Sequence, residues 1–314
     1  MKSISCVGSR RPILIVFFIL FFNLFIYTGQ ENTFEENWFL IQKEYSKMVE
    51  LYNLKGYDRF CIEGWKSKRK KIGNMINGKP NRGFLNHGSI KETMMRNKVS
   101  DFEEIYLLKC LSAETKEKLD RFKDVDWLPR ISRTFNCSAN SLGQLYYAAK
   151  IFENMKNKKI KTIIEFGGGY GAFARILKMM DPNLTIFVID LPEFISLQAL
   201  FLRETLKSED VVVHYEIPQQ YKRGSINLIP IYLIEDVDLS VDVFVSNFGL
   251  SEVKVDLQDI VIDRKFFNAD FSFITGQFDQ GNIFRGLKSC YSEVLINPFH
   301  LVLHSYELTA RCQI

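Results

Sequence analysis

An acidic residue followed by closely spaced glycines stands near the middle of the chain. Glu165 ends a β-branched run that begins at Ile160. Three glycines follow at alternate positions, Gly167, Gly169 and Gly171. Glycine lets the backbone turn sharply and lets a ligand approach the main chain. A carboxylate beside such a turn attracts a cationic group, so the spacing predicts a binding site for a ligand that carries positive charge.

The residues around this turn predict a strand, a turn and a helix in succession. The isoleucines of 160–164 suit a buried strand. Apolar residues recur at helical spacing over 173–180, so a helix is expected to begin at about Tyr170 and to end at Asp181-Pro182. Strand, glycine turn and helix form the first unit of a nucleotide-binding α/β fold.

Two kinds of ligand fit this turn. The spacing Gly167-x-Gly169-x-x-Ala172 matches the dinucleotide fingerprint, which cups a pyrophosphate. Glu165 would repel that pyrophosphate. The pattern Glu-x-Gly-x-Gly-x-Gly is similar to motif I of class I S-adenosylmethionine (SAM) methyltransferases, whose ligand carries an amino group and a sulfonium. We therefore favour SAM as cofactor over NAD(P), and a turn without a ligand is the remaining alternative.

A second acidic residue follows the next predicted strand. Leu184–Ile189 runs into Asp190, nineteen residues after Gly171. An acid at this place can accept both hydroxyls of a ribose, which suits either ligand. Leu191 comes directly after it. The predicted cofactor-binding residues are therefore Glu165, Gly167, Gly169, Gly171, Asp190 and Leu191.

Further apolar runs predict the rest of a sheet. A helix is expected over Glu193–Leu206, behind Pro192. The remaining strands are expected near Ile226–Ile231, Val241–Asn247, Phe271–Gln277 and Phe299–Leu308, the last as a candidate antiparallel edge, with Val211–Tyr215 as an extra strand or a competitor for the third place. The fold class predicted is α/β, a Rossmann-like methyltransferase sheet with helices on both faces.

The chain divides by composition into three predicted parts. Residues 1–30 are a hydrophobic segment, residues 31–137 a mostly helical leader or lid, and residues 138–314 the SAM-binding domain. Within the leader, apolar spacing predicts a helix over 34–48 and another over Asp101–Lys123, with Phe102, Ile105, Leu108 and Leu111 on one side. The basic run Lys66–Lys71 is interpreted as a solvated face, with contact to an anionic lipid or polymer as the alternative.

The hydrophobic segment is typical of a targeting signal. Arg10-Arg11 precede a stretch without charge from Pro12 to Gln30, and residues 12–27 are mostly apolar. We interpret it as an uncleaved signal anchor, with a cleaved signal or a non-native start as alternatives. Membrane attachment through the N-terminus is then expected, and the secretory-pathway lumen or the cytoplasm are the other compartments considered.

Composition limits the other function classes. The 314 residues are 46% hydrophobic and 25% charged, which are globular values, so a full core is expected. The net charge of +4 is too small to indicate binding to nucleic acid, and we predict no nucleic-acid partner. The six cysteines are scattered without a metal-binding spacing, so buried free thiols and no metal are expected.

Four short motifs lie between Ser138 and Glu252. They are Ser138-x-Asn140-Ser141-Leu142 with Leu145-Tyr146-Tyr147, the turn Glu165–Gly171, the motif Asp190-Leu191-Pro192-Glu193, and Ser251-Glu252. Over about Ser138–Glu252 the chain therefore resembles a family of sugar O-methyltransferases. This resemblance implies a SAM-dependent O-methyltransferase that acts on a hydroxyl of a sugar or glycan. An NAD(P)-linked oxidoreductase and a non-catalytic methyltransferase-like binding domain are the alternatives.

A sugar hydroxyl is a weak nucleophile, so a base near its proton should assist the transfer. Glu252 is the predicted catalytic residue, because it follows the fourth predicted strand at the carboxyl edge of the sheet. A helix-capping acid is the alternative role for Glu252. His214, His300 and His304 are the other candidate bases.

Overall fold

The computed structural model describes residues 32–96, 98–277 and 282–312. The predicted anchor at 12–27 lies outside these residues. Within the described ranges, none of the helices combines the length and the apolar character needed to cross a bilayer. Phe34–Ile314 cluster as one compact unit, which contains both the leader and the sheet.

Buried apolar runs form an eight-stranded sheet in the order β3-β4-β2-β1-β5-β6-β8-β7. The central strand β1 (Thr162–Phe166) pairs in parallel with β2 (Thr185–Asp190) and β5 (Val243–Asn247). The other strands are β3 (Val211–Val213), β4 (Ile226–Pro230), β6 (Phe271–Gln277), β7 (Glu293–Pro298) and β8 (Ser305–Arg311). Only β8 runs antiparallel to its neighbours β6 and β7 among these eight strands. The predicted Rossmann-like α/β class is confirmed.

The two edges of the sheet differ from the sequence prediction. Val211–Val213 forms a strand of its own, parallel to β4, and does not compete with Ile226–Pro230. The late strand begins at Ser305 and not at Phe299, which lies in the loop before it. The sequence analysis missed β7 altogether, because this edge strand leaves most of its side chains exposed and shows no alternating pattern.

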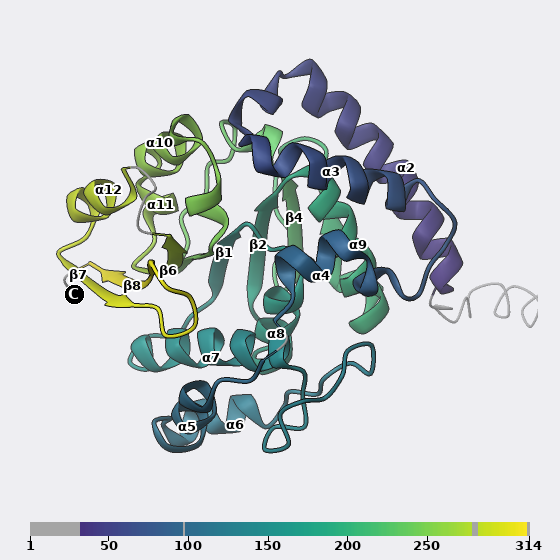
Figure 1. The fold of residues 1–314 in the computed structure, drawn as a ribbon. Helices are drawn as coiled ribbons and strands as arrows, with labels where there is room; N and C mark the ends of the chain where they lie inside the picture. The colour runs from purple at the N-terminus through teal and green to yellow at the C-terminus, as the bar shows by residue number, and fades with distance from the viewer. Residues whose placement is uncertain (1–31, 97, 278–281, 313–314) are drawn as a thin grey trace, which may run out of the picture. The chain divides into compact units, whose positions relative to one another are not determined.

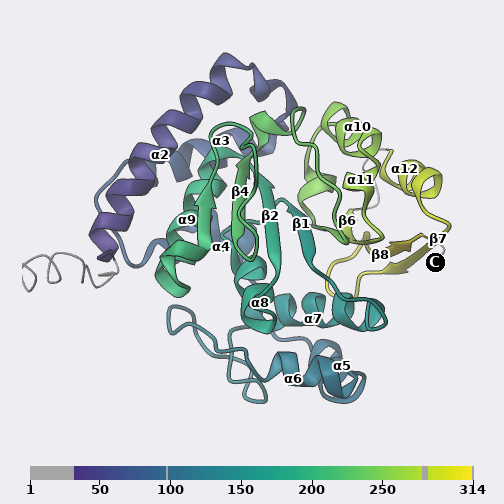
Figure 2. The same cartoon turned by 180° about the vertical axis from the view of Figure 1, so that it is seen from behind.

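Three helices of the sheet domain begin where the sequence provides a start signal. α7 (Ala139–Asn154) is capped by the Ser138 side chain, which accepts the N–H of Ser141. α8 (Ala172–Met180) follows the glycine turn, and α9 (Pro192–Thr205) has its proline in the first turn. The last three are α10 (Val255–Asp263), α11 (Lys265–Asn268) and α12 (Ile283–Cys290), which gather beside β6 and β8 in Figures 1 and 2.

The leader packs against helices of the sheet domain. Its helices are α2 (Phe34–Leu54), α3 (Glu63–Ile76), α4 (Gly88–Met94), α5 (Asp101–Lys109) and α6 (Ala113–Leu119). α2 and α3 both contact α9, and Figures 1 and 2 show the three side by side. α5 and α6 lie beside α7, at the opposite end of the leader.

The predicted helix over Asp101–Lys123 is wrong in two respects. It breaks into α5 and α6, because Ser112 caps a new helix by accepting the N–H of Thr115. The predicted apolar side is also not the buried one. Phe102, Ile105 and Leu108 are each about half exposed, at 52%, 50% and 49%, whereas Leu107 is buried, so α5 is rotated from the expected orientation. Leu111, the fourth residue of the predicted side, is buried as expected and lies beyond the end of α5.

Two other surface expectations hold only in part. Within the basic run, Lys66, Lys70 and Lys71 are exposed as expected, but Arg69 is buried. The five cysteines in the described part of the chain are free, and Cys61 and Cys137 are buried. The exposed thiols are Cys110 and Cys312, contrary to the expectation that all would be buried.

Candidate functional site

A cavity of about 600 Å³ lies at the carboxyl ends of β1, β2 and β5. The sheet supplies Glu165, Asp190 and Asn247 to its wall, and the leader supplies Trp65 and Arg96. β1 stands between β2 and β5, so the strand order reverses here. In open α/β sheets, ligands bind at this switch point.

The glycines of the turn have two distinct structural roles. Gly167 has φ +83°, and a Cβ on it would lie 2.8 Å from the Cα of Gly249, so it lets two loop backbones touch. A Cβ on Gly169 would meet only Met94, at 3.8 Å. Gly171 has φ +97° and precedes α8, outside the lining of the cavity. Space for a ligand is therefore provided at Gly169.

Glu165 lies in the wall without a partner for one of its oxygens. The residue is only 2% exposed, and its Oε2 makes no hydrogen bond within the described structure. Burial raises the pKa of this carboxyl well above its ordinary value, and the charge of Asp190 raises it further. A buried polar atom without a partner is costly, so the site fits a ligand that donates a hydrogen bond or carries positive charge.

Asp190 is tied to the same turn. Its Oδ1 accepts the N–H of Leu191 at 2.8 Å, and its Oδ2 accepts from Gln198 at 2.9 Å and from the N–H of Gly169 at 3.2 Å. Burial raises the pKa of Asp190 to about 7, although the hydrogen bonds from these donors act to lower it. A carboxylate has about four lone-pair positions, so acceptor capacity remains for a ribose hydroxyl.

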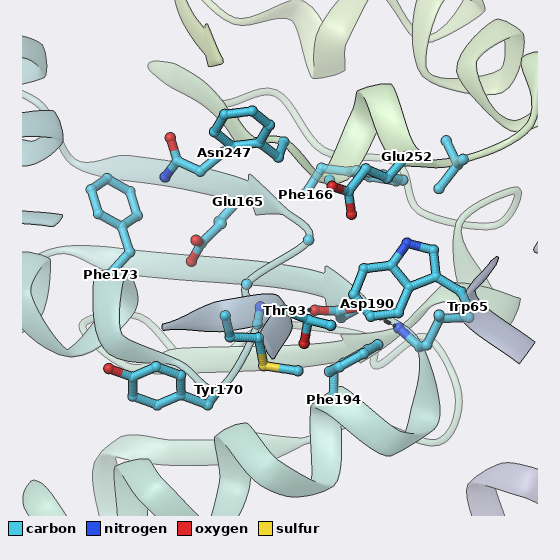
Figure 3. Close-up of a pocket in the computed structure, with 18 of the residues that line it drawn as sticks. Trp65, Thr93, Glu165, Phe166, Tyr170, Phe173, Asp190, Phe194, Asn247 and Glu252 are labelled. Atoms are coloured by element: carbon cyan, nitrogen blue, oxygen red, sulfur yellow. Dashed lines mark hydrogen bonds between the residues drawn. The ribbon is translucent and has the colours of Figure 1, made fainter. Parts of the chain in front are cut away.

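Glu252 lies at another part of the cavity, in the short helix η5 (Gly249–Glu252). Burial raises its pKa, while the charge of Lys68 and a hydrogen bond from Trp65 lower it. The Trp65 ring meets Phe194 edge-on at 5.4 Å. Figure 3 shows Trp65 and Glu252 together at one end of the cavity, Glu165 at the other, and Asp190 between them.

Asn247 is a site residue that the sequence analysis missed. It ends β5 and lines the cavity at the same end as Glu165 (Figure 3). Both its amide nitrogen and its amide oxygen are buried without a hydrogen-bond partner in the described structure. A polar residue at the carboxyl end of a buried strand is the signal that could have identified it. Its amide can both donate to a ligand and accept from it.

Part of the chain matches a known protein family. Residues 121–216 match the O-methyltransferase domain family. The matched segment contains the glycine turn, Glu165 and Asp190, and ends before Asn247 and Glu252. This match over residues 121–216 supports a SAM-dependent methyltransferase domain in this chain. No curated protein matches the chain.

Solved structures of methyltransferases resemble the methyltransferase domain at low identity. PigF with SAH shares 11% identity over 55% of this chain and 58% of its own, with a TM-score of 0.35. The mitomycin 7-O-methyltransferase MmcR shares 10% over 55% and 57%, with a TM-score of 0.36. The N-methyltransferase NodS from Bradyrhizobium japonicum, with SAH, shares 13% over 54% and 86%, with a TM-score of 0.37. The chain thus spans less than two thirds of the first two.

The histidines proposed as alternative bases lie elsewhere in the methyltransferase domain. None of them is among the described residues that line the cavity. His214 is 3.0 Å from Asn227 near the β3 edge of the sheet, and His300 is 3.2 Å from Glu103. His304 is exposed in the loop between β7 and β8. Over the described ranges, no group of three His, Cys, Asp or Glu side chains is placed to hold a metal ion.

Proposed function

We propose that this chain transfers the methyl group of SAM to a hydroxyl group of a sugar or glycan. The observation that carries the proposal is the pair of buried carboxyl groups, Glu165 and Asp190, beside the glycine turn at the switch point of the sheet. The match of residues 121–216 to an O-methyltransferase domain supports transfer to oxygen. The resemblance of the motif Asp190–Glu193 to sugar O-methyltransferases supports the acceptor class.

The polar groups along the cavity follow the order of groups in SAM. Glu165 suits the ammonium of the amino-acid portion, and Asp190 suits a ribose hydroxyl. A ligand held in this way extends its adenine toward Trp65 and Glu252, at the end of the cavity beyond Asp190 (Figure 3). Phe194 and Ile231 also line the cavity, which suits a purine ring. A dinucleotide would instead bring its pyrophosphate close to Glu165.

The chain's own residues mainly position and shield the reactants. Bound SAM supplies an activated methyl group: the acceptor oxygen bonds to the methyl carbon as the carbon–sulfur bond breaks, and the hydroxyl proton leaves to a base or to water. Asn247 lies at the Glu165 end, where its unpartnered amide can orient an acceptor hydroxyl. Glu252, the predicted base, lies at the other end, where the adenine amino group is a competing partner.

Binding and product analysis together test this function. We expect titration calorimetry on the full chain to show micromolar binding of SAM and S-adenosylhomocysteine and no binding of NAD⁺. Asp190→Ala should weaken SAM binding by about 1–3 kcal/mol if a buried hydroxyl loses its acceptor. Mass spectrometry should then find methylated glycans only in cells that contain the chain. Tight NAD⁺ binding without SAM binding would replace the methyltransferase with the oxidoreductase, and SAM binding without any methylated product would favour the non-catalytic domain.

A further inference from the structure

An arginine from the leader reaches the wall of the cavity. Arg96 follows α4 and is the only arginine among the described residues that line the cavity. Its side chain is 20% exposed. Nη1 donates to Oε1 of the buried Glu103 at 2.6 Å, and Nη2 donates to the hydroxyl of Tyr147. A guanidinium has five N–H groups, so donors remain beyond these two bonds.

The surroundings of Arg96 hold it in one place. A Cβ on Gly143 would collide with the guanidinium, so α7 carries a glycine where Arg96 packs against it. A glycine inside a helix costs about 1 kcal/mol relative to alanine, and here it gives room to the arginine. The rings of Tyr147 and Phe299 lie 5.2 and 5.8 Å from the guanidinium carbon. This packing fixes a positive charge at the cavity wall.

Arg96 lies near the glycine turn. Met94, two residues before it, is the nearest neighbour of the Cβ position on Gly169. Gly143 and Tyr147 belong to α7, which also provides Asn140, and Asn140 donates to the Tyr170 hydroxyl at 2.6 Å. Figure 3 shows Tyr170 at the Glu165 end of the cavity. Arg96 thus reaches the cavity between α4 and α7, and both of these helices supply residues next to the glycine turn.

We propose that Arg96 binds the carboxylate of the methionine portion of SAM. This inference rests on the proposed function, which assigns the cavity to SAM. The amino-acid portion carries one cation and one anion, and Glu165 can neutralise only the ammonium. The planar guanidinium matches a carboxylate in a two-bond geometry that lysine does not provide. Glu103 lowers the cost of burying Arg96 and orients it, while the remaining N–H groups serve the ligand.

The test compares SAM with decarboxylated SAM, which lacks only the carboxylate. Titration calorimetry on the full chain measures the two dissociation constants. We expect Arg96→Met to weaken SAM binding about 10–100-fold, the loss of a charge-assisted hydrogen-bond pair, and to change decarboxylated SAM by less than about threefold. Because this variant leaves Glu103 buried beside an apolar side chain, the double variant Arg96→Met/Glu103→Gln is measured alongside it.

Gly143→Ala gives an independent result, because it displaces the guanidinium and keeps its charge. This variant should bind SAM no more tightly than decarboxylated SAM while remaining folded. Lys91→Met, which removes an exposed cation of α4 outside the cavity lining, is the matched control and should keep the preference for SAM. An equal loss of both ligands in the Arg96 variants, or no loss of either, overturns the carboxylate role. A wild-type chain that binds neither ligand overturns the proposed function itself, which is a distinct outcome.

Discussion

Arg69 and Glu193 form a buried ion pair that joins the leader to the sheet domain. Arg69 Nε lies 3.1 Å from Glu193 Oε2, and Nη2 lies 3.3 Å from Oε1. The two side chains are 11% and 6% exposed. Arg69 also donates to Asp58 at 2.8 Å. Trp65 is one helical turn before Arg69 on α3, so the pair holds that ring in the cavity wall.

Arg69→Met should therefore destabilise the protein strongly. Removing one partner of a buried ion pair leaves the other charge uncompensated and costs about 3–5 kcal/mol. Lys70→Met, one residue away on the exposed side of α3, should change the stability by less than about 0.5 kcal/mol. Urea unfolding of the two variants measures the difference. Equal stabilities would mean that the pair adds nothing to the docking of the leader.

The sequence predicts the sheet well because most of its strands are short runs of buried apolar residues. β1 and β2 follow this pattern closely, and Glu165 near the end of β1 and Asp190 at the end of β2 were identified from their positions alone. The edge strand β7 was missed because exposed side chains leave no such pattern.

Contacts between distant segments could not be predicted in the same way. Arg69 belongs to a run of basic residues, and only the position of Glu193, 124 residues away, shows that its side chain is buried. Trp65 and Arg96 likewise reach the cavity from the leader, and neither carries a local motif. Asp190–Glu193 matched a family motif, and the structure explains its last residue as the partner of Arg69.

Cofactor binding should release protons near neutral pH. Burial raises the pKa of Asp190 to about 7 and that of Glu165 well above its ordinary value in the free protein. A ligand with an ammonium and a sulfonium favours the ionised carboxylates, so binding lowers both pKa values. Affinity for SAM should therefore increase as the pH rises from about 6 to about 8. Calorimetry in buffers of different ionisation enthalpy measures the protons released, and proton uptake would contradict this assignment of charges.

The two glycines of the turn should respond differently to the same substitution. Gly167→Ala places a Cβ against the Gly249 backbone at positive φ, so it should lower the melting temperature. Gly169→Ala adds strain of about 1–2 kcal/mol but meets only the Met94 side chain, so the protein should fold. Its affinity for SAM should fall. Thermal unfolding and calorimetry separate the two effects, and an unchanged SAM affinity in the folded Gly169 variant would move the cofactor away from the turn.

The roles of Glu252 and Asn247 can be separated by two substitutions. Glu252 lies beside Trp65 at the end of the cavity assigned to adenine, and Asn247 lies at the Glu165 end with both amide atoms unpartnered. We expect Glu252→Gln to weaken SAM binding and to lower kcat/KM for SAM by a similar factor. Asn247→Leu should leave SAM affinity nearly unchanged and lower turnover, because the acceptor hydroxyl loses the group that orients it.

The opposite pattern would restore the role that the sequence suggested for Glu252. A general base contributes about 10²–10⁴-fold to the rate, so Glu252→Gln would then lower turnover by that factor at constant SAM affinity. Calorimetry with S-adenosylhomocysteine measures the effect on binding, and single-turnover rates on an unmethylated glycan pool measure the effect on the chemical step. His214→Asn serves as the control, because His214 is hydrogen-bonded to Asn227 outside the cavity lining. This substitution should change neither the binding affinity nor the single-turnover rate. If Glu252→Gln alters neither binding nor turnover, the charge of Glu252 has no part in either step.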